Sequence, residues 1–239
     1  MSGQTILLKI PKEKMADKAL VMGDPDRVIL LTNLLDDHEI LFNQRGIIVV
    51  GGYYRGERIV LASHGIGCGM ASLVFEELGD LGVNKFIRLG TAGALRPEIE
   101  IGSPVIASGA GYIYGGSGLG MYLPNICSGS APDPILATYA YKKLLEKGYT
   151  PYIGPVFTSD ALYAEENFIE MLSSRGFIAI EMEAACLYAL SWMRGWRSLA
   201  VLIISNNLVR KTPFKSTMEL KKLFLDIASI LADILIEIE

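Results

Sequence analysis

The chain has 239 residues, of which 51% are hydrophobic and 20% are charged, and its formal net charge at pH 7 is −4. A chain of this length can bury the core of one large α/β domain, and its acidic balance argues against a nucleic-acid-binding protein, which normally carries a basic face. Residues 1–14 lack the apolar core of a signal peptide, and no run approaches the ~20 apolar residues of a membrane span, so we expect a cytoplasmic protein.

Apolar runs of strand length alternate with segments of helical periodicity along the chain. We predict strands at residues 19–22, 47–50, 59–62, 86–89, 105–107 and 199–204. We predict helices at residues 26–35, 70–81, 134–146, 165–173 and 183–193, and a last one within residues 216–238. Strands this hydrophobic are usually covered on both faces, which predicts a single-domain three-layer α/β/α sandwich with a central mixed sheet. Since composition shows no break and no internal repeat, we treat residues 1–239 as one domain.

Glycines follow several of the predicted strands directly: Gly23, Gly65, Gly67, Gly90 and Gly93. In open α/β sheets, ligands bind where loops cluster at the carboxyl ends of strands. Tight turns are the alternative explanation for each glycine taken alone. Their repetition at equivalent strand ends favours one shared binding site.

The first candidate motif is Gly-Asp-Pro-Asp-Arg at residues 23–27. Gly23 permits close approach of the backbone to a ligand, and Pro25 suits the first turn of a helix. Arg27 then lies one turn into that helix, near amides that attract anions. The alternative is an aspartate cap followed by a surface arginine.

The second motif is Ile-Arg-Leu-Gly-Thr-Ala-Gly at residues 87–93. An arginine within an apolar strand is costly unless it is paired or binds an anion. Arg88, the hydroxyl of Thr91 and the intervening backbone amides make a good set of donors for phosphate. A buried salt bridge is the alternative.

The third motif is Ile-Glu-Met-Glu-Ala-Ala at residues 180–185, where a predicted helix begins. Acidic residues are common caps in a first helical turn, which explains one of the two glutamates. A carboxylate that accepts hydrogen bonds from ribose hydroxyls would explain the second.

The cysteines, Cys68, Cys127 and Cys186, show no CxxC spacing, and the chain has only two histidines, so we expect no metal site. Cys68 and Cys186 lie among apolar and small residues, as buried thiols do. Cys127 lies in a polar loop, where a free thiol and a disulfide across a subunit interface are both open.

These three motifs, with Asn-Gln-Arg-Gly at residues 43–46 and His-Gly-Ile-Gly at residues 64–67, resemble the purine-nucleoside and uridine phosphorylase family. The nearest resemblance is to archaeal methylthioadenosine/purine nucleoside phosphorylases, and it runs in order from about residue 20 to residue 206. It implies a pentosyltransferase that cleaves a purine ribonucleoside with inorganic phosphate, giving free base and ribose 1-phosphate. Phosphate is then a co-substrate and no cofactor is expected. The family's oligomers imply a homo-oligomer, a hexamer built from dimers.

The resemblance also implies roles for individual residues. The phosphate-binding residues would be Gly23, Arg27, Arg45, Arg88 and Thr91, with Arg45 reaching into a neighbouring subunit's site. The nucleoside-binding residues would be Ile66, Leu162, Tyr163, Glu181, Met182, Glu183, Ser205 and Asn206. Among these, Arg88, Glu183 and Asn206 are the expected catalytic residues.

The chain departs from the family at the base. Purine-cleaving relatives usually have Ser-Asp where this chain has Ser205 and Asn206, and an amide donates a hydrogen bond but supplies no proton. Either the acid comes from elsewhere, or substrates whose base leaves more easily are preferred. Asn206 suits a 6-oxopurine, because an amide can bridge a ring nitrogen and a carbonyl oxygen. The adjacent Asn207 leaves the register of the match open.

Two further positions depart from the family. Many relatives place a histidine in the stretch that matches residues 4–7, where this chain has none. Relatives also stack an aromatic ring where this chain has Leu162, and Tyr163 would substitute if the loop shifts. The resemblance therefore predicts phosphate and ribose binding, but it does not predict which base and which 5′ group are preferred.

Three other functions remain as alternatives. A uridine phosphorylase would show a Gln-x-Arg base clamp after Tyr163, and residues 164–167 have none. A nucleosidase that uses water would have no reason to keep Arg27, Arg45 and Arg88 together. A non-catalytic nucleoside-binding protein is compatible with Asn206. Outside the motifs, His64 is expected to be a structural hydrogen-bonding residue, and residues 109–120 an interface loop or a lid.

Overall fold

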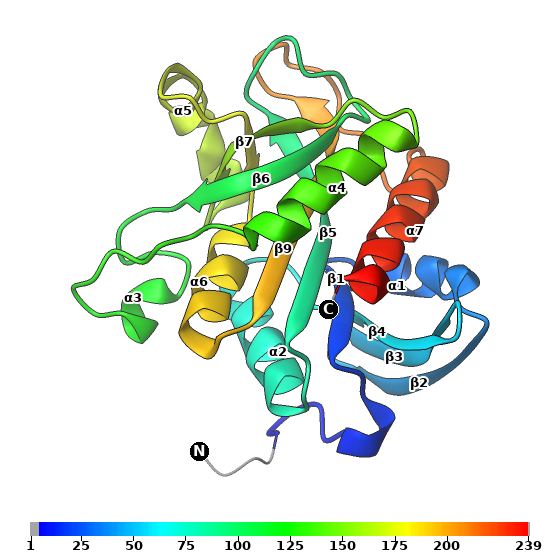
Figure 1. Ribbon diagram of the computed structural model, residues 1–239. Coiled ribbons are helices and arrows are strands. Elements are labelled where there is room, and N and C mark those ends of the chain that lie inside the picture. Colours follow the sequence, from blue (N-terminus) through cyan, green and yellow to red (C-terminus); the bar gives the residue numbers. More distant parts are fainter. Residues whose placement is uncertain (1–4, 239) are drawn as a thin grey trace.

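The computed structural model describes residues 5–238, and within them one mixed sheet of nine strands forms the centre (Figure 1). The strands are β1 (Lys18–Met22), β2 (Asp37–Gln44), β3 (Ile47–Tyr54), β4 (Glu57–Ser63), β5 (Lys85–Ala94), β6 (Pro104–Gly111), β7 (Tyr152–Thr158), β8 (Ala179–Glu181) and β9 (Arg197–Asn207). Their order is β2-β3-β4-β1-β5-β8-β7-β6-β9, and β5 also pairs with β9. The strands β5, β8, β7, β6 and β9 therefore close into a ring, from which β1 to β4 extend as an open sheet.

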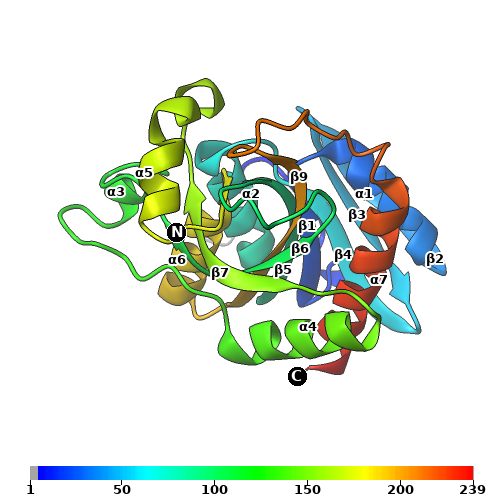
Figure 2. The same ribbon diagram turned by 90° about the horizontal axis from the view of Figure 1, so that it is seen from above.

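Helices cover both sides of the sheet (Figure 2). The α-helices are α1 (Pro25–Leu31), α2 (Cys68–Asp80), α3 (Leu119–Tyr122), α4 (Pro134–Glu146), α5 (Ile169–Ser174), α6 (Ala184–Arg194) and α7 (Lys221–Glu237). Three short 3₁₀ helices are η1 (Lys12–Lys14), η2 (Thr32–Leu34) and η3 (Leu162–Phe168). Buried side chains of α2 and α6 form one core with the sheet, and those of α1, α4 and α7 form a second. Two cores with the sheet between them confirm the expected α/β/α fold class.

Each of the predicted strands overlaps an observed strand, but β2, β7 and β8 were not predicted. The segment predicted as a helix at residues 26–35 divides into α1 and η2, and that at residues 165–173 divides between η3 and α5. The last helix begins at Lys221 rather than in the preceding polar segment. Gly90 and Gly93 lie within β5, so they do not follow a strand as expected.

The sheet topology places several strand ends together. The pairs β1–β4, β1–β5 and β5–β9 are parallel, so these strands share one carboxyl edge. Near this edge, Ala92 pairs with Ile204 and Gly93 pairs with Asn206, which makes Ser205 an extra residue in β9. Such a β-bulge changes the direction in which side chains point and is common beside binding sites.

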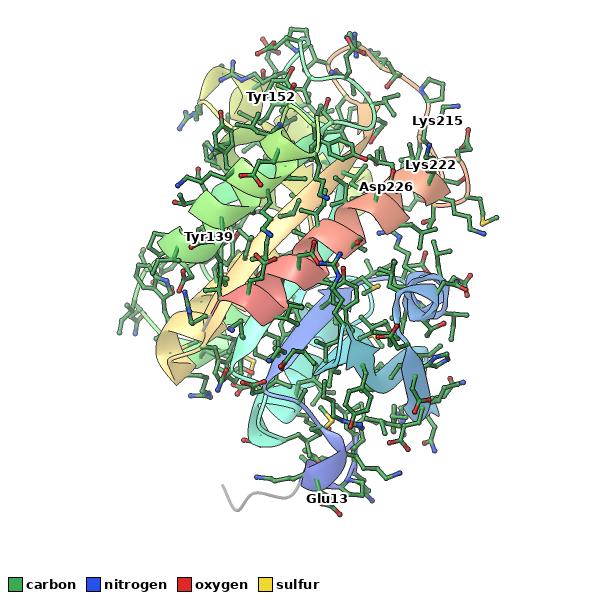
Figure 3. All side chains as sticks on the ribbon, turned by 45° about the vertical axis from the view of Figure 1, so that its right-hand side comes forward. Glu13, Tyr139, Tyr152, Lys215, Lys222 and Asp226 are labelled. Atoms are coloured by element: carbon green, nitrogen blue, oxygen red, sulfur yellow. The ribbon has the colours of Figure 1, made fainter. Side chains whose placement is uncertain are left out.

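Helices α4 and α7 lie side by side on one face of the sheet (Figure 3), where the hydroxyl of Tyr149 donates to Asp226 at 3.2 Å. The segment leading into α7 returns to the carboxyl edge, because the backbone N–H of Lys215 donates to the carbonyl of Ser205 at 2.8 Å. The adjacent Phe214 consequently lies against the cavity described below. Within residues 5–238, no helix is long and apolar enough to span a membrane.

Candidate active site

A cavity of about 780 Å³ opens at the shared carboxyl edge of the strands. The sequence-predicted residues that line it are Gly23, Arg27, Arg45, Ile66, Arg88, Thr91, Leu162, Glu181, Met182, Glu183, Ser205 and Asn206. Tyr163 does not line it, and its side chain is fully exposed. Positions more than 180 residues apart in the chain are thus brought to one site, because β1, β4, β5 and β9 end together.

Arg88 is buried at the inner end of this cavity. Its Nη2 donates to Glu183, and its Nη1 lies 3.3 Å from Oε2 of Glu181. Burial lowers the pKa of Arg88, but the carboxylates of Glu183 and Glu181 outweigh it and raise the pKa above its usual value. Arg88 is therefore in a buried ion pair, the alternative given above, and it also lines the cavity, while its binding of phosphate stays a prediction.

Two of the donors of Arg88 are left over. Among the described residues, Nε and Nη1 are buried and have no hydrogen-bond partner, although Nη1 is ion-paired with Glu181. Buried donors without acceptors are rare and costly, so a bound anion would stabilise this arrangement. Gly90 makes room for the guanidinium of Arg88, since a β carbon at residue 90 would overlap Nη1.

Arg27 approaches the same place from α1. Asp24 caps this helix by accepting from the N–H of Asp26 at 2.9 Å, and Pro25 occupies the first turn, as the sequence predicted. The Nε of Arg27 donates to Thr217 at 2.9 Å, and its guanidinium lies over the ring of Phe224. Burial lowers the pKa of Arg27 and the nearby positive charge of Arg88 adds to this effect, whereas the carboxylate of Asp24, 3.6 Å from Nε, opposes it. Two buried cations close enough to repel make a suitable site for an anion.

The two glutamates of the third motif have different environments. Glu181 accepts from the backbone N–H groups of Glu183 and Ala184 at 2.8–3.0 Å, and from the hydroxyl of Thr158 at 2.5 Å. It therefore caps α6 from the end of β8. Glu183 accepts from the N–H of Gly67 at 2.6 Å and from Arg88, and makes no cap of its own. Of the two, Glu183 is the carboxylate positioned for a ligand.

The remaining phosphate-site candidates come from turns and strand ends. Arg45 and Gly46 form the turn between β2 and β3 with φ values of 55° and 74°, the left-handed pair of a tight hairpin. The side chain of Arg45 is exposed, and within residues 5–238 it has no ion-pair partner. Gly23 lies against the carbonyl of Gly65, which a β carbon would approach to 3.1 Å. The absence of a side chain at Gly23 therefore allows the two backbone segments to lie close together.

Asn206 and the adjacent Asn207 have different environments. The hydroxyl of Ser205 lies 3.3 Å from Oδ1 of Asn206 and 3.2 Å from the carbonyl of Ala92. Asn207 is completely buried, and its Nδ2 donates to the carbonyls of Arg96 and Ile99 at 2.8 and 3.0 Å. Asn207 therefore holds a neighbouring loop, and Asn206 is the amide that lines the cavity.

Several lining residues were assigned no role from the sequence: Met70, Ala92, Ile180, Leu208, Phe214 and Glu165. All but Glu165 are apolar. Glu165 is different, because it is a buried acid on η3. Its burial was not predictable from the sequence, since it lies in the polar run Ala-Glu-Glu-Asn at residues 164–167.

His64 lies at the end of β4, beside the arginines but outside the cavity lining. It is completely buried, its Nδ1 lies 2.9 Å from the carbonyl of Gly65, and its ring packs edge-on against Phe75. Burial and the charge of Arg88 lower the pKa of His64 well below its usual 6.5. The imidazole is thus neutral and adds no third positive charge to the site.

Other predicted features do not line the cavity. Cys68 and Cys186 are buried and Cys127 is exposed, all as free thiols. No cluster of potential metal ligands occurs among residues 5–238. Residues 112–126 contain α3 and border a separate cavity of about 190 Å³. Of the stretch 4–7, Gln4 lies outside the described residues, while the N–H groups of Ile6 and Leu7 bind Glu77.

Comparisons with known proteins find relatives that are nucleoside phosphorylases. A family model described as the phosphorylase superfamily matches residues 17–238. Guanosine phosphorylase from Halorubrum lacusprofundi is 33% identical over 192 residues, which cover 80% of this chain and 78% of that protein. A DeoD-type purine nucleoside phosphorylase from Caldanaerobacter subterraneus subsp. tengcongensis is 34% identical over 227 residues, covering 92% and 95%.

The fold also matches a solved structure. Purine nucleoside phosphorylase from Toxoplasma gondii, crystallised with immucillin-H, superimposes with a TM-score of 0.85. The superposition covers 97% of this chain and 96% of that one at 23% sequence identity. At 23% identity, this similarity is evidence for the fold alone.

Proposed function

Because the chain belongs to the phosphorylase superfamily, we propose that it is a purine nucleoside phosphorylase, a pentosyltransferase that splits a ribonucleoside with inorganic phosphate. The products are the free base and ribose 1-phosphate. The observation that carries the proposal is Arg88. Within residues 5–238, its buried Nε and Nη1 have no hydrogen-bond partner, and the side chain lies beside Arg27 and next to the carboxylate of Glu183.

Phosphate is proposed to bind at the inner end of the cavity. Arg27 and Arg88 would hold it by charge-assisted hydrogen bonds, with the backbone at Gly23 and the hydroxyl of Thr91 completing the site. Such contacts fix the attacking oxygen below the anomeric carbon. They also place a negative charge where the sugar becomes cationic as the glycosidic bond stretches, so positioning and electrostatics supply most of the rate.

Glu183 is proposed to hold the ribose. Its carboxylate is oriented by Gly67 and Arg88, and each carboxylate oxygen can accept further hydrogen bonds from the sugar hydroxyls. Met182 and Ile66 would pack against the sugar. Because Arg88 contacts Glu183, phosphate and ribose would be placed relative to each other through one ion pair.

The base would lie among Leu162, Ser205 and Asn206. Asn206 is proposed to donate to the purine ring as negative charge develops on the leaving base, which a positioned amide does without transferring a proton. Tyr163 would contact the nucleoside only if η3 moves, since its side chain is exposed. Glu181 would act by capping α6 and orienting Arg88.

We further propose a cytoplasmic homo-oligomer, a hexamer built from dimers, in which residues 1–239 form one domain and no cofactor is needed. The exposed, unpaired guanidinium of Arg45 supports a subunit arrangement in which this side chain reaches a neighbour's phosphate. The exposed side chains of Ile66 and Leu162 at the cavity rim are apolar surfaces that a neighbouring subunit would cover.

One panel of assays tests the function. Inosine, guanosine, adenosine, methylthioadenosine and uridine are incubated with and without phosphate, and free base is followed. We expect phosphate-dependent release of base from at least one purine nucleoside. Release without phosphate would identify a nucleosidase, and release from uridine alone a uridine phosphorylase. Binding of a purine nucleoside without release at any phosphate concentration would identify a non-catalytic binding protein.

A further inference from the structure

Thr217 lies beside the phosphate site, and the proposed chemistry gives it no role. It belongs to the polar segment between β9 and α7, and its side-chain oxygen Oγ1 accepts from Nε of Arg27 at 2.9 Å. The same hydroxyl donates to Oδ2 of Asp24 at 3.5 Å. Because a hydroxyl can accept and donate at once, Thr217 joins the arginine to the residue that caps α1.

The contacts of Arg27 leave the far end of its guanidinium for a ligand. Nε is bonded to Thr217 and lies 3.6 Å from the carboxylate of Asp24, and Cζ lies 4.5 Å from the centre of the Phe224 ring. Within residues 5–238, neither Nη1 nor Nη2 of Arg27 makes a hydrogen bond. Since Arg27 lines the cavity, these two nitrogens are the donors available to an anion bound there.

Of the three contacts, only the one with Thr217 fixes the direction of the guanidinium. At 3.6 Å, the carboxylate of Asp24 is beyond hydrogen-bond distance from Nε, and attraction to a ring face depends little on how the guanidinium is turned above it. A hydrogen bond of 2.9 Å is directional. Because the guanidinium is planar, a bond at Nε also sets where Nη1 and Nη2 lie.

The backbone around Thr217 is itself held in place. The N–H of Lys215 donates to the carbonyl of Ser205 at 2.8 Å, which ties the segment to β9. The N–H of Ser216 donates to the carboxylate of Glu219 at 2.8 Å, which closes the turn before α7. The hydroxyl of Thr217 is therefore a fixed acceptor.

Resting on the proposed function, we propose that Thr217 is a positioning residue for phosphate binding, whose hydroxyl holds Arg27 so that Nη1 and Nη2 can bind the phosphate oxygens together. Thr217 itself does not line the cavity. Without its hydroxyl, the charge of Arg27 would still attract phosphate, but its donors would lose their alignment. The effect therefore falls on phosphate and leaves the nucleoside unaffected.

The test compares Thr217→Val, which removes the hydroxyl and keeps the shape, with Thr217→Ser, which keeps the hydroxyl. The assay uses a purine nucleoside that the wild type cleaves. For Thr217→Val we expect KM for phosphate to rise about 10-fold, as for loss of a hydrogen bond to a charged group, while KM for the nucleoside stays at the wild-type value. Thr217→Ser should restore most of the affinity for phosphate.

The matched control is Ser216→Ala. It removes the neighbouring hydroxyl, which binds Glu219 at 3.1 Å, and should leave KM for phosphate unchanged. Equal rises in Thr217→Val and Ser216→Ala would overturn the proposal, because the segment as a whole would then matter. A normal KM in Thr217→Val, a rise in KM for both substrates, or no recovery in Thr217→Ser would overturn it as well. If Thr217→Val does not fold, Thr217→Ala takes its place, with the same outcomes deciding.

A second measurement separates this proposal from the proposed function. If the wild type cleaves no purine nucleoside, the proposed function has failed, and the rise in melting temperature with added phosphate then tests the role of Thr217 alone. We expect a clear rise in the wild type and Thr217→Ser and a smaller one in Thr217→Val at the same phosphate concentration. Equal rises in all three proteins, or none in the wild type, would refute the role of Thr217.

Discussion

Arg88 lies directly over Gly90 in β5, so that a β carbon on Gly90 would overlap Nη1 of Arg88. The side chain of Arg88 can occupy this position only because residue 90 has no β carbon. The variant Gly90→Ala tests whether this position is needed for phosphate binding. The guanidinium cannot retreat without losing Glu183 or Glu181, to which it is bound. We expect KM for phosphate to rise at least about 10-fold, because a displaced arginine loses aligned donors, and the melting temperature to fall, because the buried ion pairs are weakened.

The control is Gly69→Ala on α2, where a β carbon would meet no atom. This change should leave KM for phosphate as in the wild type, and alanine favours the helix over glycine by about 1 kcal/mol. A normal KM in Gly90→Ala would contradict the placement of Arg88.

Removing Arg88 itself should affect both phosphate binding and stability. Arg88→Ala leaves two buried carboxylates, those of Glu181 and Glu183, without their cation, which typically costs about 3–5 kcal/mol. We expect phosphate to raise the melting temperature of the wild type, because it binds the folded state, and not that of the variant. Arg175→Ala, at an exposed position after α5, is the control and should respond to phosphate normally. Phosphate-dependent turnover by Arg88→Ala would refute the assignment.

The sequence allowed prediction of the strands that are buried on both faces, because continuous apolar runs are diagnostic of them. It missed β2, whose residues are exposed or half-buried, and β7, which contains Gly154 and Pro155. It missed β8 because three residues are too short for a pattern. Only the structure shows that the apolar residues before α6 form strand β8, and that Glu181, the last residue of β8, caps α6.

For the site, arginines and glycines were predictable because they are unusual where they occur: a charge in an apolar strand, or a glycine at a strand end. Glu165 was not, since an acid in a polar segment is normally solvated and only η3 buries it. The choice between Asn206 and Asn207 also required the structure. The bulge at Ser205 decides which amide faces the cavity, and a sequence pattern does not reveal a bulge.

The variants Asn206→Asp and Asn207→Asp should therefore have different effects, the first on substrate preference and the second on stability. An aspartate at position 206 supplies an acid beside the leaving base, so we expect cleavage of adenosine relative to inosine to rise about 10-fold or more. An aspartate at position 207 loses the donors to Arg96 and Ile99, so it should lower stability by about 1–3 kcal/mol and leave the substrate preference unchanged. Initial rates on both nucleosides and urea denaturation measure the two effects. A change of substrate preference by the second variant alone would reverse the assignment.

His64 predicts the sign of one pH effect on stability. Its pKa in the folded protein is lowered well below 6.5 by burial and by Arg88, whereas an unfolded chain binds a proton near pH 6.5. Below that pH the unfolded state holds the extra proton, so the free energy of unfolding falls as the pH is lowered and is fully regained above it. Urea denaturation of the wild type and His64→Asn from about pH 8 to about pH 5 measures this contribution. We expect a shallower fall in His64→Asn and an unchanged one in His38→Gln, at an exposed position on β2. The same slope in all three proteins would mean that His64 takes up its proton in the folded state, where it would add a positive charge beside Arg27 and Arg88.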